Sequence, residues 1–257
     1  MKTGKEHFKN LDAYSHERHS ELSGMLQPFV ECTDRYGELL CRASVAIAEV
    51  PPSNVQDRVL RDLMANVFDF LFETRRLILE GKVVIAFPLG RRAYESLSLL
   101  ALCAQDKNVA KRWQRGRIIT NDKVRHQLSK QSMPESDKDT QKLYKFFSKA
   151  AHPNRSLVPH RYLGEGNSFV FGAIGKPDLV FVTDSCIKNL QMWFWFGAVI
   201  SYTYRDVLSR RDHLFVRDYF EAAKMAEKVV EWLGKNWEHL LREAQDAIQG
   251  DAGRDQV

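Results

Sequence analysis

Apolar side chains recur every three or four residues along most of this sequence, the spacing that gathers them on one face of a helix. A first stripe of this kind runs through residues 22–50 and ends at Pro51, because proline cannot continue a helix. Pro28 is expected to kink this helix near its start. The pattern therefore predicts one long amphipathic helix in this region.

Two more helices are predicted after it. Ser53 and Gln56 have the spacing of a capping box, and Gly81 supplies a C-terminal stop, so a second helix is expected between them. A third helix is expected over residues 83–105. Its second half is almost wholly apolar, which is typical of a helix at the centre of a bundle.

The middle of the chain predicts shorter elements. Residues 108–130 are expected to form one or two short helices, divided near Gly116 or Thr120. The polar residues 131–139 are expected to form a solvated loop, and the apolar stripe returns in a helix over residues 139–151.

The pattern changes again after this helix. Short apolar runs at residues 169–171 and 179–182, with turn-forming residues between them, predict a small β-hairpin insert at about residues 161–183. The remaining elements are two long helices and a flexible tail, expected at residues 183–208, 213–248 and about 249–257.

Together these elements predict a mainly α protein, an up-and-down bundle of five or six helices with a small β-hairpin insert. A length of 257 residues is compatible with one or two domains. No linker-like break in composition divides the chain, so a single helical domain over residues 1–257 is expected. Bundles of this class hold cofactor sites, nuclease sites and interaction surfaces alike, so the fold does not identify a function.

Composition narrows the class of protein. Hydrophobic residues make up 44% of the chain and charged residues 28%, which excludes a disordered or collagen-like chain. The most apolar stretch, residues 192–204, is shorter than the roughly 20 residues that a membrane span requires, so a buried helix or an interface is expected there, and no membrane contact. The first residues carry several charges and no apolar run, so they do not resemble a secretory signal, and a cytoplasmic location is expected.

The four cysteines stand apart in the sequence, each beside apolar residues, and are expected to be buried, reduced thiols. They are Cys32, Cys41, Cys103 and Cys186. His16 and His19 have a helical spacing that suits a metal, but no third ligand stands near them. No metal and no other cofactor is therefore predicted.

Positive charge is concentrated in the middle of the chain. Residues 75–161 hold 19 lysines and arginines against 7 acidic residues, whereas the rest of the chain holds 19 against 26. Within residues 107–130, eight basic residues surround Trp113, and Asp122 is the only acid. This pattern is typical of a phosphate-binding face with an aromatic ring for stacking on bases. The alternative is a solvated helix pair that the acidic flanks of the same chain neutralise.

The residues expected to contact nucleic acid are the basic and aromatic side chains of this segment and of the region after it. They are Lys111, Arg112, Trp113, Arg115, Arg117, Lys123, Arg125, Lys149, Arg155 and His160. RNA is therefore a candidate partner.

Arg91 and Glu95 stand four residues apart in the apolar third helix, so they project from one face and can form a charge-assisted pair. Desolvating two charges is unfavourable unless they are paired and further hydrogen-bonded. Two interpretations follow. The pair either fixes the register of the helix or belongs to a catalytic or ligand-binding site.

Ser148 and His152 also stand four apart, and Pro153 places His152 at the C-terminus of its helix, where the helix dipole favours the imidazolium. A charged histidine there suits a general acid or a donor to phosphate. The alternative is a capping histidine that bonds the last carbonyls. Arg155 and His160 have an Arg-x4-His spacing, which a chain of this composition produces by chance.

Three short motifs in succession resemble a group of bacterial helical proteins of the HEPN-like, abortive-infection type. The motifs are Arg91-x-x-x-Glu95, Lys111-Arg112-Trp113 and Ser148-x-x-x-His152-Pro153. The resemblance covers roughly residues 83–154 and implies a helical bundle that is often dimeric. Many such proteins are metal-independent ribonucleases, in which a histidine and an arginine of an Arg-x4–6-His motif act on the 2′-hydroxyl and the scissile phosphate.

This chain departs from that motif, because Pro159 interrupts its Arg-x4-His segment. Two hypotheses follow. In the first, the chain is a ribonuclease in bacterial stress or phage defence, and its catalytic residues are Arg91, Glu95, Ser148 and His152. His152 is then the acid or base, Arg91 stabilises phosphorane charge and Glu95 orients Arg91, which requires Arg91 and His152 within about 10 Å.

In the second hypothesis, the chain is a non-catalytic module of a defence or toxin–antitoxin complex. It binds nucleic acid, a protein partner or a second copy of itself. The aromatic face of residues 192–204 is then its partner surface.

Overall fold

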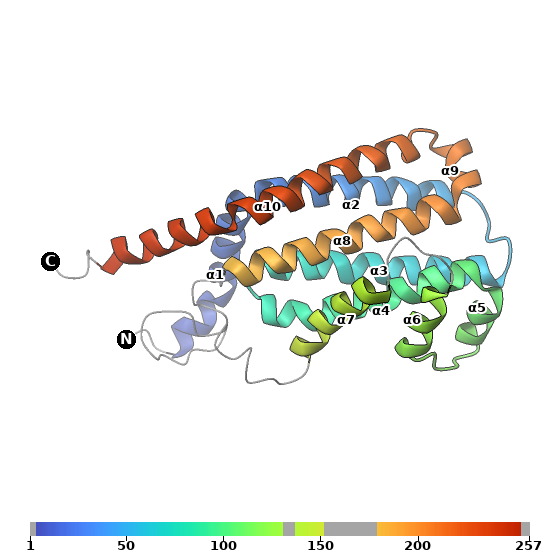
Figure 1. Cartoon of the computed structure of the whole chain (residues 1–257), viewed down its shortest axis with the longest axis horizontal. Helices are drawn as coiled ribbons and strands as arrows, with labels where there is room; N and C mark the ends of the chain where they lie inside the picture. The colour runs from blue at the N-terminus through green and yellow to red at the C-terminus, as the bar shows by residue number, and fades with distance from the viewer. Residues whose placement is uncertain (1–3, 131–136, 152–178, 253–257) are drawn as a thin grey trace.

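The computed structural model describes the backbone of residues 4–130, 137–151 and 179–252, and the side chains of residues 9–130, 141–148 and 179–236. These residues form helices joined by short connections, and none of them lies in a strand (Figure 1). In chain order the helices are α1 (Gly4–Met25), α2 (Gln27–Ala48), α3 (Val55–Leu79), α4 (Val83–Gln105), α5 (Lys107–Gln114), α6 (Asn121–Ser129), α7 (Asp137–Ala151), α8 (Leu179–Thr203), α9 (Arg205–Arg211) and α10 (Phe215–Ala252).

Helix α8 lies at the centre of the bundle. It packs against α2 and α10 on one side and against α3 and α4 on the other (Figure 1). Helices α3 and α4 form the most extensive helix pair among the described residues. The short helices α5, α6 and α7 cover the outer side of this pair, so the basic segment of the sequence lies on the outside of the bundle.

The central place of α8 explains its composition. A helix with neighbours on several sides buries most of its circumference and needs apolar side chains there. Trp193 and Phe196 are both 1% exposed, and Trp193 donates a hydrogen bond of 3.0 Å to the buried side chain of Asn189. The predicted core helix is confirmed here. None of the described helices combines the length and the apolar composition that crossing a bilayer requires.

The mainly helical prediction is also confirmed, but the predicted number of five or six helices is too low. The stripe of residues 22–50 is divided at Leu26 into α1 and α2, and Pro28 lies in the first turn of α2, where a missing N–H has no cost, rather than at a kink. The predicted helix 183–208 is divided in the same way at Tyr204. Apolar periodicity does not reveal these breaks, because the stripe continues across them.

The predicted β-hairpin is wrong where the structure describes it. Residues 179–182 form the first turn of α8 instead of a strand, and the other proposed strand lies outside the described residues. The ring of Phe181 lies 5.0 Å from that of Phe87 and 6.4 Å from that of Phe146, between centroids. A four-residue apolar run fits a buried helical turn as well as a strand, and packing decides between them.

The start of α3 differs from the expected capping box by one residue. Asn54, not Ser53, is the N-cap, and its side chain accepts a hydrogen bond from the Asp57 amide at 3.0 Å. Asp57 in turn accepts from the Ser53 amide at 2.9 Å. The two bonds satisfy amides that a helix start leaves without partners. Gln56, which the expected capping box would have used, is therefore available for another contact.

The expected stop at Gly81 is confirmed, and the division expected near Gly116 or Thr120 is present, since α5 ends before Gly116 and α6 begins after Thr120. Gly81 and Gly116 have φ values of 71° and 69°, the left-handed conformation that glycine adopts without a steric penalty. After Gly116 the Arg117 amide bonds the Arg112 carbonyl at 3.2 Å, which closes α5. The chain therefore turns sharply between α5 and α6 and holds both helices at one end of the bundle.

Candidate nucleic-acid interface

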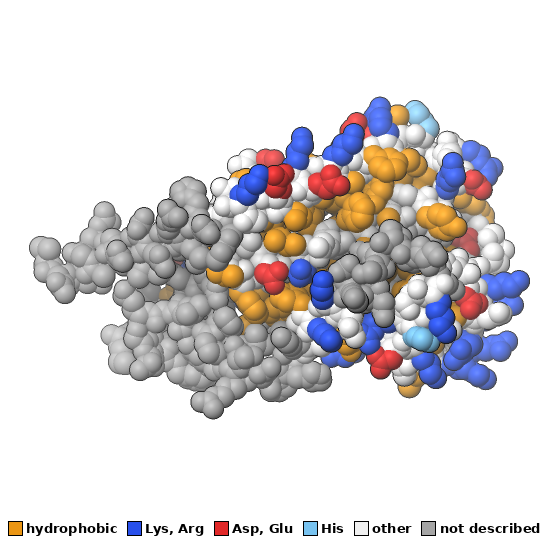
Figure 2. All heavy atoms as spheres, viewed as in Figure 1, with side chains coloured by type: hydrophobic (Ala, Val, Ile, Leu, Met, Phe, Trp, Pro, Cys, Tyr) orange, Lys and Arg blue, Asp and Glu red, His pale blue; other side chains and the backbone are white. Residues whose placement is uncertain are grey.

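Basic side chains gather at the end of the molecule formed by α5 and α6, in the lower right of Figure 2. We call seven exposed cations of α5, α6 and their flanking residues the basic face. They are Lys107, Lys111, Arg112, Arg115, Arg117, Lys123 and Lys130. Five of them were expected contacts from the sequence, and Lys107 and Lys130 extend the set at its two ends.

The cations of the basic face have no ion-pair partners among the described residues. None of its seven cations forms an ion pair with a described acidic side chain. Asp122, the one acid of this segment, pairs with Arg125 instead. The carboxylate of Asp106 caps α5 by accepting from the Asn108 amide at 2.8 Å. In the described part of the structure, no acidic residue of the flanks forms an ion pair with this face.

Trp113 is placed differently from the expectation. Its side chain is partly buried and packs against the hydrophobic core, so it anchors α5 to the bundle. A fully exposed stacking ring is therefore not available at this position. The exposed apolar residue here is Ile118, which is 89% exposed in the connection between α5 and α6.

A second polar group lies where α4, α6 and α7 meet. Arg91 donates from Nε to Glu95 Oε1 at 2.9 Å, and both side chains are 25% exposed. Glu95 Oε1 also accepts from Asn121 at 3.2 Å, and Arg91 Nη2 donates to the Tyr144 hydroxyl at 3.1 Å. The hydrogen bond that Arg91 donates to Glu95 raises the pKa of Arg91, so its guanidinium stays charged. The expected Arg91–Glu95 contact is present within α4, and the hydrogen bonds with Asn121 and Tyr144 connect it to α6 and α7.

Two guanidinium groups face the ring of Tyr144. The Cζ atom of Arg125 lies 4.5 Å from the ring centroid and that of Arg91 lies 5.3 Å away. Such cation–π contacts are stabilising at this range. The Nε of Arg125 is buried and bonds to no described group. Tyr144 and Asn121 were not predicted as site residues, although the four-residue spacing of Tyr144 and Ser148 places them on one face of α7.

Ser148 lies one turn after Tyr144, and its hydroxyl is buried without a described partner. The neighbouring Phe147 packs on Gly90 of α4, so this part of α7 lies against the turn that carries Arg91. The remaining predicted groups are outside the described residues: the side chain of Lys149, and His152, Arg155 and His160. The structure thus brings Arg91, Glu95 and the helix of Ser148 together, and the contact of Arg91 with His152 remains a prediction.

The cysteines follow the expectation in three of four cases. Burial raises the pKa of the Cys32 and Cys103 thiols to about 12, and Cys186 is likewise buried, so these thiols are unreactive near neutral pH. Cys41 is exposed, because it lies on the outer face of α2. Among the described side chains, no group of histidine, cysteine and acidic residues is arranged to hold a metal ion.

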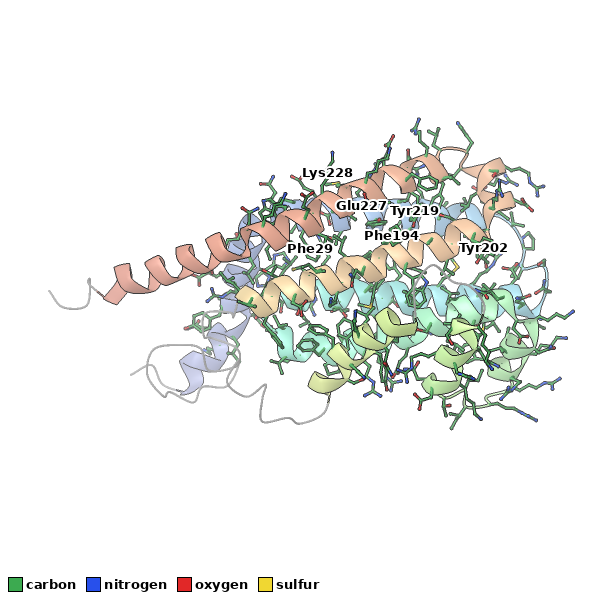
Figure 3. The ribbon with its side chains drawn as sticks, viewed as in Figure 1. Phe29, Phe194, Tyr202, Tyr219, Glu227 and Lys228 are labelled. Carbon is green, nitrogen blue, oxygen red and sulfur yellow. The ribbon has the colours of Figure 1, made fainter. Side chains whose placement is uncertain are left out.

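An aromatic patch crosses α8 and α10, and it contributes to the orange surface in the upper part of Figure 2. Phe194 and Phe220 are 41% and 59% exposed, and both rings contact the ring of Tyr219. Figure 3 shows Phe194 and Tyr219. Further along α8, Tyr202 is 80% exposed. Part of the face of residues 192–204 is therefore open to solvent, while Met192, for example, is fully buried.

Comparison with known proteins adds no further constraint on the function. No protein-family model, no curated protein and no solved structure matches this chain.

Proposed function

We propose that this chain binds RNA through the basic face of α5 and α6. The observation that carries the proposal is that these seven exposed cations have no acidic partner among the described residues. Like charges held close together repel one another, and a phosphate backbone relieves that repulsion while it releases condensed counterions. The resemblance to HEPN-like proteins favours RNA over DNA as the source of the phosphates.

The arrangement of the face suits a single strand. Lys107, Lys111 and Arg115 follow one another at four-residue spacing along α5 and its end, so they form a row on one side of the helix. Lys123 continues the charge on α6. The connection between the two helices adds Arg117. A row of this kind follows successive phosphates and reads no sequence by itself.

The test is the affinity for a fluorescently labelled single-stranded RNA, measured by anisotropy over a range of salt concentrations. The variant is Lys111→Glu/Lys123→Glu. Its matched control is Lys224→Glu/Lys228→Glu, which reverses two exposed lysines of α10 that form no ion pair with a described residue. We expect the first pair to weaken binding roughly tenfold or more and to reduce the slope of log K against log salt by about 1.4, at about 0.7 per lost contact.

The control variant should bind RNA as the wild type does. Equal weakening by both variants would mean that only net charge matters, and unchanged binding by the first variant would mean that RNA does not contact the basic face. Either result overturns the proposal. A DNA of the same sequence is the comparison ligand, and tighter binding of DNA than of RNA would also count against it.

The polar group at Arg91 favours a second candidate, cleavage of the bound RNA. Glu95 and Tyr144 hold the Arg91 guanidinium on two sides, and the buried Ser148 hydroxyl on the adjoining helix has no described partner. A fixed guanidinium stabilises phosphorane charge without reorganising. In this hypothesis His152 is the general acid or base, as the sequence predicts.

Cleavage is tested by incubating RNA with the wild type, His152→Ala and Arg91→Gln in the presence of EDTA. A ribonuclease of this kind should cleave without metal and lose cleavage in both variants, while His152→Ala retains RNA affinity. Intact RNA with all three proteins would leave the chain as a binding module and exclude this second candidate. Expression of the same variants in growing cells shows whether toxicity follows cleavage.

A further inference from the structure

The two most exposed large hydrophobic side chains that the structure describes lie at the same end of the bundle as the basic face. Ile118, in the connection between α5 and α6, is 89% exposed, and Tyr202, near the end of α8, is 80% exposed (Figure 3). Figure 1 shows this connection and the end of α8 at one end of the molecule. Neither side chain has a charge for the phosphate contacts of the proposed function, so both are open to a different contact.

The backbone around Ile118 holds its side chain outward. Gly116 turns the chain with a φ of 69°, and Ile119, directly after Ile118, is partly buried against the hydrophobic core. Thr120, the next residue, is extended. Successive side chains of an extended segment point to opposite sides, so the anchoring of Ile119 exposes Ile118. Because Arg117 of the basic face directly precedes it, Ile118 lies within that face.

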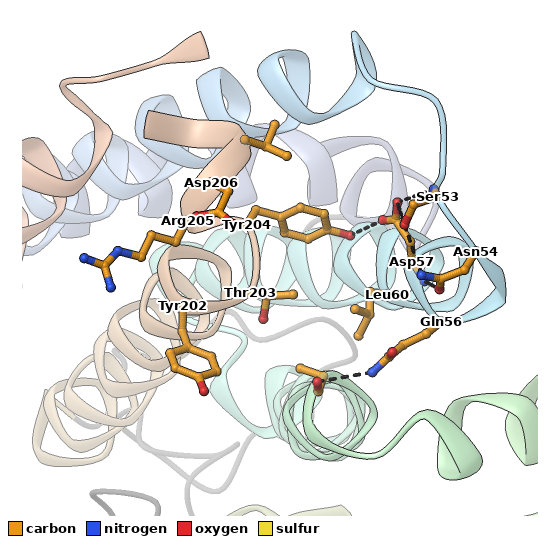
Figure 4. Close-up of a pocket in the computed structure, with 12 residues that line it drawn as sticks. Ser53, Asn54, Gln56, Asp57, Leu60, Tyr202, Thr203, Tyr204, Arg205 and Asp206 are labelled. Carbon is orange, nitrogen blue, oxygen red and sulfur yellow. Dashed lines mark hydrogen bonds between the residues drawn. The ribbon is translucent and has the colours of Figure 1, made fainter. Parts of the chain in front are cut away.

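Tyr202 lines a polar cavity of about 500 Å³, where the start of α3 meets the junction of α8 and α9 (Figure 4). Ala104, near the end of α4, also lines this cavity, and Lys107, the first residue of α5, follows three residues later. Three residues of chain span at most about 11 Å. The ring of Tyr202 is therefore separated from the basic face by little more than this cavity, and a strand of a few nucleotides reaches both.

The hydrogen bonds described in the cavity are internal to the fold. Gln56 donates to the carbonyls of Cys103 and Ala104 at 2.7 and 3.2 Å, which connects α3 to the end of α4. Asp57 accepts from the Tyr204 hydroxyl at 2.8 Å, which connects α3 to the start of α9. These groups hold the cavity walls in place. The exposed ring of Tyr202 is what the cavity offers to a partner.

The charges near Tyr202 favour a flexible strand over a flat anionic surface such as a membrane. Asp206 lines the cavity, is exposed and forms no ion pair with a described residue, and Arg205 adds one cation. A flat anionic surface in contact with both Ile118 and Tyr202 would bring its phosphates against Asp206, which is unfavourable. A single strand can turn a base toward Tyr202 and keep its phosphates at the basic face.

We propose that Ile118 and Tyr202 contact the bases of the RNA whose phosphates lie on the basic face. Tyr202 stacks on one base, and Ile118 packs against the flat face of another. Every base has such a face, so these contacts do not choose among bases. In a duplex the base faces stack on one another and are closed to both side chains. The inference rests on the proposed RNA binding and names single-stranded RNA as the ligand of that site.

The test uses two single-stranded anions, an RNA of mixed sequence and linear inorganic polyphosphate, which has phosphates but no bases. Affinities for both, and for a duplex RNA, are measured by isothermal titration calorimetry at several salt concentrations for the wild type, Ile118→Ala and Tyr202→Ala. The matched controls are Ile85→Ala and Phe220→Ala, which shorten side chains that are 51% and 59% exposed on α4 and α10, outside the basic face. Tyr202→Phe is the conservative variant, because it keeps the ring.

We expect Tyr202→Ala to weaken binding of single-stranded RNA by about 5- to 150-fold, the range for one lost stacking contact, and Tyr202→Phe to bind as the wild type does. Ile118→Ala should weaken it by about 4- to 15-fold, the effect of one or two fewer buried methylene groups. Neither alanine variant should change the affinity for polyphosphate or duplex RNA. Neither should change the slope of log K against log salt, because neither removes a charge.

The outcomes separate this inference from the proposed function. If Ile118→Ala and Tyr202→Ala bind RNA as the wild type does while Lys111→Glu/Lys123→Glu binds it more weakly, the chain binds RNA through the basic face alone and the base contacts are overturned. Equal losses for RNA and polyphosphate in the alanine variants, or losses of the same size in the controls, also overturn them. So does a loss that Ile118→Ala shows only on phosphatidylglycerol vesicles, since a membrane is then the partner of this side chain. Absence of RNA binding by the wild type overturns both proposals.

Discussion

Basic side chains have different roles in two regions of this molecule. Arg42 of α2 donates to Asp212, at the end of α9, at 2.7 Å and to Asp218 of α10 at 2.8 Å, and Asp218 also accepts from Arg217 at 2.9 Å. On the basic face, seven cations of the same two types pair with no described acid. The first group joins helices of the bundle, and the second leaves its charge to solvent or to a partner. The difference shows that basic composition alone identifies no binding surface, whereas a cluster of basic side chains without acidic partners does indicate one.

The largest effect is expected from Asp218→Ala. This carboxylate is 4% exposed and accepts from two arginines, so its loss removes one charge-assisted hydrogen bond between α2 and α10, from Arg42, and one within α10, from Arg217. We expect a loss of about 2 to 3 kcal/mol in the free energy of unfolding, measured by urea denaturation. Asp122→Ala is the matched control on the other region, because its carboxylate is 84% exposed, and it should change stability by less than about 0.5 kcal/mol. Equal losses in the two variants would remove the contrast between the regions.

Gly90→Ala tests whether the packing of α7 on α4 holds the Arg91 site together. Packing is expected to matter here because this region has few ion pairs of its own. A Cβ atom on Gly90 would lie 2.5 Å from the Phe147 ring, so α7 would have to move away from α4. We expect a loss of about 1 to 3 kcal/mol in urea denaturation. Gly37→Ala is the control, because a Cβ there meets nothing within 4 Å, and it should stabilise the helix by about 0.5 to 1 kcal/mol. Stabilisation by both substitutions would show that close packing of Phe147 on Gly90 does not hold α7 against α4.

Much of the fold was predictable from the sequence, because helix periodicity is a local property. The stripes gave the approximate extents of α3, α4 and α7, and Gly81 and Gly116 marked two ends. The misassigned strand at residues 179–182 depended on packing against Phe87, which a local pattern does not contain. The break at Leu26 was hidden because an apolar residue occupies it.

The site was predictable only within single helices. The four-residue spacing of Arg91 and Glu95 predicted their contact correctly, since both lie on α4. The contacts of Arg125 and Asn121 with this group cross from α6, and they depend on how the short helices pack. Tyr202 and Thr203 stood in the most apolar run of the chain and resembled core residues there, although they line a polar cavity.

Acid should weaken the paired region and leave the basic face unaffected. Hydrogen bonds from Arg42 hold the pKa of Asp218 below its ordinary value of 3.8, although burial acts in the opposite direction. Because the folded state holds this carboxyl ionised, its contribution is complete above pH 3.8 and is lost as the pH falls through the lower, folded value. Asp218→Asn should therefore flatten the fall of stability below about pH 4, measured by urea denaturation at several pH values. If the fall of stability below about pH 4 is unchanged in Asp218→Asn, other carboxyl groups cause it.

The smallest effect on stability is expected from the basic face itself. Because Lys111 and Lys123 have no acidic partner among the described residues, Lys111→Glu/Lys123→Glu removes repulsion without breaking an ion pair that the structure describes. We expect a change within about 0.5 kcal/mol in urea denaturation, in either direction. Added salt should also narrow the difference from the wild type, because it screens exposed charges beyond about 10 Å at 0.1 M. A loss of more than about 1 kcal/mol would mean that these lysines stabilise the fold as Arg42 does, and the distinction between structural and partner-directed cations would no longer hold.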